Sequence, residues 1–205
     1  MARYLEIAAG AKRGLNWDAY RDVADPSRGV EKYDFRQLPM RGVWDNTYDG
    51  AYSEHFIEHL TADEGIAFFK EMYRILKPGG TIRTIWPPHE FIDKLLSNQK
   101  LTPDQEMFCA HYHNFYVLQH GFCPKEHRDK SIREQCAHGL LWQNGEHLYV
   151  WYESELIETL KELGFIMVKK HKYQESRMLD FTNIDTQGKI RALHSAVVEA
   201  QKPWS

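Results

Sequence analysis

Residues 61–86 read TADEGIAFFKEMYRILKPGGTIRTIW and contain the clearest helix pattern in the chain. Thr61 is a good N-cap residue and Glu64 follows three positions later, so the pair predicts a capping box at a helix start. Apolar side chains then recur at helical spacing up to 77–80, where Lys-Pro-Gly-Gly cannot continue a helix. Residues 81–86 are rich in β-formers and predict a strand. A capped helix that passes into a buried strand is typical of an α/β unit.

The neighbouring sequence repeats this alternation. The patterns predict strands at 3–9, 48–52, 165–173 and 192–200, a helix at 153–163, and short helices near 90–97 and 103–118. A loop rich in His, Cys and Gly follows residue 118. The order predicts an α/β domain with a mainly parallel sheet. In such sheets, ligands bind beyond the carboxyl ends of the strands, so the residues after each strand are the informative ones.

The bulk composition narrows the function. The chain has 205 residues and a formal net charge of −3, which predicts one domain and gives no reason to expect a nucleic-acid partner. No apolar run approaches the roughly 20 residues of a membrane span. Three cysteines and a non-signal-like N-terminus predict a reduced, cytoplasmic protein.

Residues 51–60 read AYSEHFIEHL and contain His-x-x-Glu-His, a zinc-protease signature. Helical spacing would bring His55 and His59 to one face, as a metal requires. A protease, however, sets this motif in a longer helix and needs a third ligand, whereas here a strand ends near Tyr52 and a new helix is capped at Thr61. We therefore expect no zinc hydrolase, and interpret Glu58 as a structural or supporting carboxylate.

Six of the eleven histidines lie between residues 111 and 147. Together with Cys109, Cys123 and Cys136 they could supply metal ligands, but no pair has a recognised zinc-finger or zinc-ribbon spacing. A metal-binding protein that uses the 109–147 histidines and cysteines stays an alternative. The main interpretation assigns no metal.

A set of motifs in fixed order carries a resemblance. These are LEIAAG (5–10), NWD (16–18), DFRQLP (34–39), YDGAYSEH (48–55), YRILKPGG (73–80) and a final VEAQK (198–202). The set resembles the class I S-adenosylmethionine-dependent methyltransferases, and more narrowly a short bacterial branch that is methyltransferase type 11-like. The resemblance implies a Rossmann-like, mainly parallel sheet of seven or fewer strands, with helices on both faces and an antiparallel C-terminal strand. It also implies one domain over 1–205, with 90–150 as a substrate-capping insertion.

For the first two strands, the resemblance implies cofactor contacts residue by residue. Glu6, Ala8 and Gly10 match the loop whose backbone approaches the methionine part of S-adenosyl-L-methionine, although Ala8 stands where glycine is usual. Asp18 matches the acidic residue that binds the ribose hydroxyls. The gap from Gly10 to Leu15 is too short for a crossover helix, so either that helix is missing or 15–18 is not a regular strand.

For the following strands, the resemblance implies that Asp34 and Phe35 flank the adenine. It also implies that residues 53–55, from Ser53 to His55, face the methyl group and the substrate. Histidine suits proton transfer near neutral pH, so His55 and His59 are the candidate catalytic residues.

The expected reaction is in-line methyl transfer to a small polar acceptor, a hydroxyl or amine that could be sugar-linked. His111, His113 and His147 are the candidate substrate-binding residues. A second interpretation is an inactive protein that binds S-adenosylmethionine or S-adenosylhomocysteine. The sequence is also compatible with a homodimer.

Overall fold

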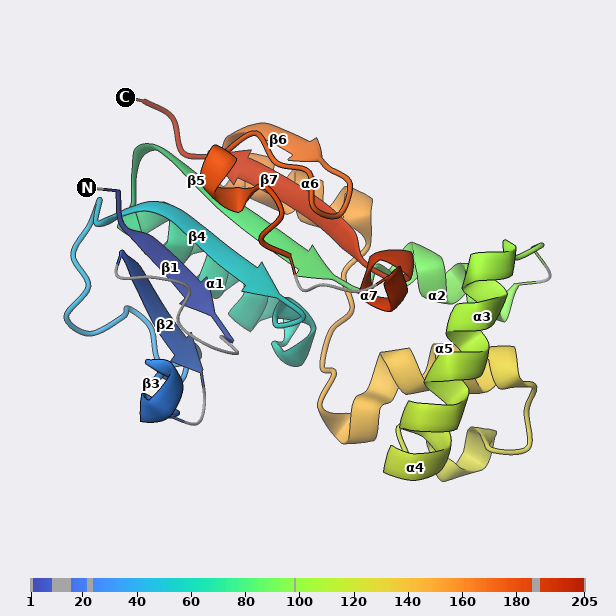
Figure 1. The fold of residues 1–205 in the computed structure, drawn as a ribbon. Coiled ribbons are helices and arrows are strands. Elements are labelled where there is room, and N and C mark those ends of the chain that lie inside the picture. Colours follow the sequence, from blue (N-terminus) through green and yellow to red (C-terminus); the bar gives the residue numbers. More distant parts are fainter. Residues whose placement is uncertain (1, 9–15, 22–23, 98, 186–188, 205) are drawn as a thin grey trace.

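In a computed structural model, which describes residues 2–8, 16–21, 24–97, 99–185 and 189–204, the described residues form one seven-stranded sheet. The strands are β1 (Tyr4–Ile7), β2 (Trp17–Arg21), β3 (Glu31–Lys32), β4 (Tyr48–Glu54), β5 (Leu76–Trp86), β6 (Ile166–Lys170) and β7 (Ala196–Gln201). Their order is β3-β2-β1-β4-β5-β7-β6; the first five pair in parallel, and β7 is antiparallel to both β5 and β6. The predicted Rossmann-like architecture is confirmed (Figure 1).

The stretch 61–86 forms α1 (Ala62–Ile75) and β5. The capping box is present: the Glu64 amide donates to Thr61 Oγ1 at 3.3 Å, and the Thr61 amide donates to Glu64 Oε2 at 2.8 Å. The helix ends earlier than predicted, because the Lys-Pro-Gly-Gly segment already belongs to β5. Gly79, at φ +79°, donates its amide to the Lys202 carbonyl, so the C-terminal strand draws this segment into the sheet.

Apolar residues cover both faces of the sheet. On one face, α1 and α6 (Glu153–Glu162) bury the main core against β4 and β5. On the other face lies the segment 173–184, which contains the short helix Leu179–Phe181. Phe181 is fully buried there against Tyr4 and Tyr52.

The segment between β5 and α6 is a helical insertion. It comprises α2 (His89–Leu96), α3 (Pro103–Tyr112), the π-helical turn His113–Val117, α4 (Leu118–His120) and α5 (Ile132–Trp142). These helices bury their own apolar cluster and lie beyond the carboxyl ends of β4 and β5 (Figure 1). The two helices predicted near 90–97 and 103–118 are confirmed. The prediction of a loop after 118 missed α5, although Ser131 and Glu134 form its capping box.

The two ends of the insertion meet. The His89 amide donates to the Trp151 carbonyl at 3.0 Å, and the Trp86 indole Nε1 donates to the same oxygen at 3.0 Å. The chain therefore leaves the sheet and returns to it at almost the same point.

The strand predicted at 192–200 is shorter than expected. Residues 189–193 form α7 (Lys189–Leu193), and β7 begins at Ala196. The cause is local, because His194 Nδ1 bonds the Ile190 carbonyl four residues back at 2.8 Å and so extends a helical turn. Among the described residues, no helix combines the length and apolar character needed to cross a membrane.

Candidate functional site

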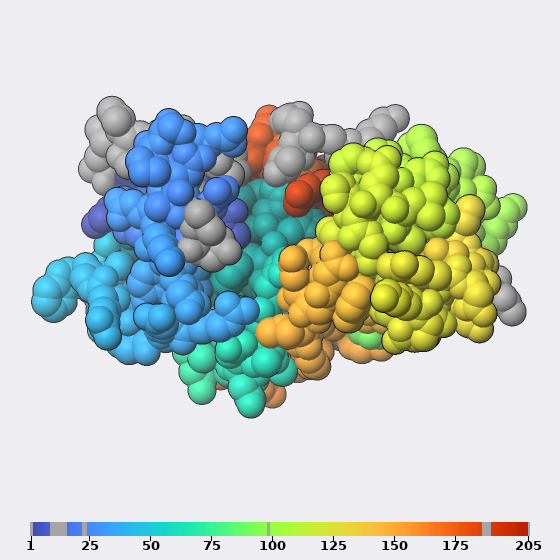
Figure 2. Space-filling model, turned by 90° about the horizontal axis from the view of Figure 1, so that it is seen from below, coloured from blue at the N-terminus to red at the C-terminus, as the bar shows by residue number. Residues whose placement is uncertain are grey.

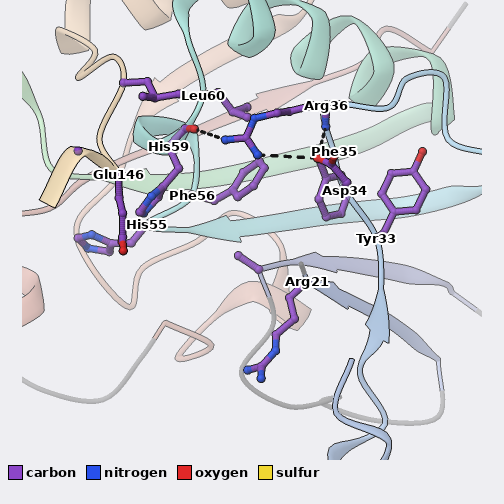
Figure 3. Close-up of a pocket in the computed structure, with 13 residues that line it drawn as sticks. Arg21, Tyr33, Asp34, Phe35, Arg36, His55, Phe56, His59, Leu60 and Glu146 are labelled. Atoms are coloured by element: carbon purple, nitrogen blue, oxygen red, sulfur yellow. Dashed lines mark hydrogen bonds and ion pairs between the residues drawn. The ribbon is translucent and has the colours of Figure 1, made fainter. Parts of the chain in front are cut away.

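A cavity of about 490 Å³ lies at the carboxyl ends of the first four strands. Its wall is formed by residues that end or follow these strands: Ala8 after β1, Arg21 at the end of β2, residues 33–36 after β3, and His55 with Phe56 after β4. Gly145 and Glu146 from the insertion complete it. This is the edge at which parallel sheets bind ligands, and Figure 3 shows the segments that bring the labelled residues to it.

The residues after β3 give this cavity an acidic group beside an aromatic wall. Asp34 Oδ1 accepts the Arg36 amide at 3.0 Å, and Arg36 Nη2 in turn donates to the His59 carbonyl at 2.7 Å (Figure 3). Phe35 is buried and packs edge-on against Phe56, with ring centroids 5.4 Å apart. Both Asp34 and Phe35, predicted from the sequence, thus line the cavity.

The loop after β1 is only partly described. Ala8 lines the cavity with φ +57°, a left-handed conformation that glycine adopts more readily than alanine. Glu6 lies within β1, is buried, and is not part of the cavity wall in the described structure. Gly10 lies outside the described residues.

Two other expected cofactor residues do not reach the cavity. The prediction that Asp18 follows the second strand is wrong, since β2 starts at Trp17 and continues to Arg21. The Asp18 carboxylate instead accepts hydrogen bonds from Arg3 Nε at 2.9 Å and from the Tyr48 hydroxyl at 2.7 Å.

Ser53 was expected to face the cofactor, but it is fully buried within β4. Its hydroxyl lies 2.9 Å from that of Thr84 on the neighbouring strand. The side chain is thus used within the sheet.

His55 adopts an unusual backbone conformation directly after β4. Its φ is +52°, and strained conformations of this kind cluster at functional sites. Its Nε2 lies 2.9 Å from the Ser195 hydroxyl, and its ring lies 5.2 Å from that of His194. Burial, with a smaller contribution from Arg191, lowers the pKa of His55 to about 3, so the imidazole is neutral at pH 7.

A second cavity, of about 270 Å³, lies on the insertion side of the same histidines. His55 and His59 line both cavities. The remaining wall of the second cavity is mainly aromatic and histidine-rich: Glu58, Pro87, Phe108, Tyr112, Tyr116, Phe122, Leu140, Gln143, His147, Ile190, Arg191 and His194. Figure 2 shows the helical insertion on one side of the molecule, the N-terminal segments on the other, and the β4–α1 region between them.

The three candidate substrate histidines separate in the structure. His147 lines the second cavity. His111 is exposed on α3, and His113, which lies in the π-helical turn, lines a different cavity. The prediction that all three face one substrate is not supported, because His111 and His113 do not line the cavity that His147 lines.

Sequence reasoning missed several wall residues, namely Arg21, Tyr33, Arg36, Glu146 and His194. Arg21 ends β2 and Tyr33 directly follows β3, so correct strand boundaries would have found these two. His194 and Glu146 come from the C-terminal segment and the insertion, whose positions depend on tertiary packing.

One group of side chains could share a metal ion. Glu58, His59 and His147 each offer one possible ligand atom, and these atoms all lie within 4.8 Å of one another. In the described parts of the chain, no other group of three or more His, Cys, Asp or Glu side chains meets this condition. Only His147 belongs to the 109–147 set that the sequence alternative used. Two others of that set, His127 and His138, stack with ring centroids 3.5 Å apart.

Comparisons with known proteins concern the fold. The sequence profile of the family described as "Methyltransferase domain" matches residues 15–84. Two solved S-adenosylmethionine-dependent methyltransferases, from Archaeoglobus fulgidus and Thermotoga maritima, are each 17% identical to this chain, with TM-scores of 0.55 and 0.54. Each alignment covers 98% of this chain. It covers 86% of the Archaeoglobus chain and 83% of the Thermotoga chain. The N-methyltransferase NodS from Bradyrhizobium japonicum, solved with S-adenosyl-L-homocysteine, is 10% identical, with a TM-score of 0.52 and coverage of 98% and 78%. No curated protein matches the sequence.

Proposed function

We propose that this chain methylates a small polar acceptor. By its fold and its methyltransferase-domain match, it is a member of the class I S-adenosylmethionine-dependent methyltransferase family. The observation that carries the proposal is the pair of cavities that adjoin at His55 and His59. One cavity suits the methyl donor, and the other suits the acceptor.

The strand-end cavity fits S-adenosylmethionine by its size and chemistry. Its volume of about 490 Å³ is within the range of roughly 300–1,000 Å³ that is usual for small-molecule sites. Ala8 would approach the methionine part through its backbone, Asp34 would accept a hydrogen bond from the adenosine part, and Phe35 would supply an apolar wall. When bound, the cofactor would supply an electrophilic methyl group on its sulfonium sulfur.

The second cavity would hold the acceptor oxygen or nitrogen in line with that methyl group. His55 is neutral and buried, so it would act by accepting a hydrogen bond from an acceptor hydroxyl or amine and orienting it. His59 and His147 would line the path between the two cavities. We infer no substrate role for His111 or His113, because neither lines this cavity.

The insertion is proposed to select the acceptor. Residues 90–150 supply most of the aromatic wall of the second cavity, whereas the sheet supplies the first. We accordingly treat 1–205 as one methyltransferase-like domain with 90–150 as its substrate cap. The three free, buried cysteines support a reducing, cytoplasmic location.

A specific observation favours the alternative of a binding protein without turnover. Ala8 carries a side chain at a left-handed position that favours glycine, and its Cβ stands next to the proposed methionine subsite. Such a protein would bind S-adenosylhomocysteine and S-adenosylmethionine alike.

Calorimetric titration with both ligands tests the cofactor assignment. We expect one ligand per chain, and no heat at millimolar concentration would refute both interpretations. Incubation with S-adenosylmethionine and a panel of hydroxyl and amine acceptors, with S-adenosylhomocysteine release as the readout, then separates them. Binding without release across the panel would favour the inactive protein.

A further inference from the structure

We propose that Glu58, His59 and His147 form a binding site for one divalent transition-metal ion, with zinc as its best representative. The site lies at the wall of the second cavity. It differs from the protease arrangement that the His-x-x-Glu-His pattern suggests, because Glu58 is a ligand here and His147 replaces His55.

Glu58 is the strongest indication of a cation site. Its side chain is fully buried, and neither carboxylate oxygen has a hydrogen-bond partner among the described residues. His55 Nδ1 lies 3.2 Å from Oε1, a contact that is an ion pair only when the imidazole is protonated. A buried carboxylate whose oxygens accept no hydrogen bond is strongly unfavourable. A bound cation would remove this penalty.

His147 is oriented as metal-binding histidines are. Its Nδ1 donates to the Leu140 carbonyl, which fixes the tautomer and leaves Nε2 free to bind a cation. Among the described residues, Nε2 has no hydrogen-bond partner, and the ring is buried beside Glu58. His59 lies next to it, with ring centroids 4.9 Å apart and ring planes at 88°.

The backbone holds the three ligands together without an ion. The amides of Leu148 and Tyr149 donate to the Glu58 carbonyl at 2.8 and 3.3 Å, which ties the insertion to the turn after β4. Arg36 holds the His59 carbonyl from the other side. A site whose ligands are already adjacent needs only side-chain rotations to close on an ion.

The ligand set indicates the kind of ion. Two imidazoles and one carboxylate are typical of zinc and related first-row ions, whereas magnesium prefers oxygen ligands and water. A tetrahedral ion held by three side chains keeps one open position. Since all three residues line the second cavity, that position would open toward it.

The test uses full-length protein, freed of metal by dialysis against a chelator, and no methyl donor. Calorimetry with zinc chloride and absorption spectra with cobalt chloride should each give one ion per chain, and magnesium chloride should give no measurable heat. Glu58→Gln and His147→Ala should each weaken zinc binding on the order of 100-fold or more. Mutating a residue that only hydrogen-bonds to a metal ligand already lowers metal affinity by about 10- to 100-fold.

The stacked pair His127 and His138 provides the matched control. The double variant His127→Ala/His138→Ala should bind zinc like the wild type. Zinc should also raise the melting temperature of the wild type but not of Glu58→Gln, whose metal-free melting temperature shows whether it folds. The site is refuted if no stoichiometric zinc binds, if Glu58→Gln and His147→Ala keep wild-type affinity, or if only the double variant loses it. Because no S-adenosylmethionine is present, these outcomes are independent of the proposed methyl transfer.

Discussion

Replacing Asp34 by alanine should weaken cofactor binding about ten- to thirtyfold. A hydrogen bond to a charged acceptor contributes about 1.5–3 kcal/mol, or roughly a 10- to 150-fold change in Kd. The Asp34 side chain is 41% exposed, and Arg36 Nη1 lies 3.8 Å from its Oδ1. Solvent and the arginine therefore already screen the charge of the carboxylate. Both effects favour the lower end of the range.

Calorimetry with S-adenosylhomocysteine measures the change. Asp34→Asn keeps an acceptor for the Arg36 amide and should lose less affinity than Asp34→Ala, which separates the cofactor contact from an effect on the turn. Asp18→Ala is the matched control, because Asp18 bonds Arg3 and Tyr48 away from the cavity, and it should leave Kd unchanged. Unchanged affinity in Asp34→Ala, or a loss in Asp18→Ala that matches it, would refute the assignment.

Three further predictions concern stability. Arg83→Leu should destabilise the fold by about 3–5 kcal/mol, because it removes the arginine that pairs with two fully buried carboxylates, Asp185 and Glu199; a urea midpoint like that of the wild type would contradict this. Gly50→Ala should cost about 1–3 kcal/mol, since a Cβ there would lie 2.7 Å from the Phe181 ring, and thermal melting checks it. His55 and His194 have pKa values lowered to about 3, chiefly by burial, so between pH 6.5 and 3 the unfolded chain takes up protons that the folded chain does not. Their contribution to the free energy of unfolding is therefore present above pH 6.5 and falls by about 1.4 kcal/mol per histidine for each pH unit below it. His194→Gln should make the free energy of unfolding less dependent on pH between pH 7 and 5. A pH dependence as steep as that of the wild type would contradict this prediction.

The fold was largely predictable because its signals are local. The capping box of α1, the spacing of apolar residues behind it and the β-rich run that follows need no tertiary information. Errors arose where tertiary pairing overrides composition. Lys-Pro-Gly-Gly reads as a turn but pairs with the C-terminal strand, and β2 continues past Asp18 because Trp17 and Ala19 are both buried.

The site was predictable only in its strand-end half. Asp34, Phe35 and His55 follow strands, and sheet geometry brings such residues together. The partnership of Glu58 with His147 depends on how the insertion folds back, which no local pattern encodes. The sequence did flag His-x-x-Glu-His, but it could not show which of its members would meet a third ligand.

The meeting of the insertion's two ends, where His89 bonds Trp151, has an evolutionary consequence. A segment that departs and returns at one point can change in length with little entropic penalty, since loop-closure entropy grows only slowly with chain length. Its helices also bury their own apolar cluster, so exchanging them disturbs the sheet little. Descendants of this chain could therefore exchange this helical segment, while the sheet and the loops at its strand ends stay under separate selection.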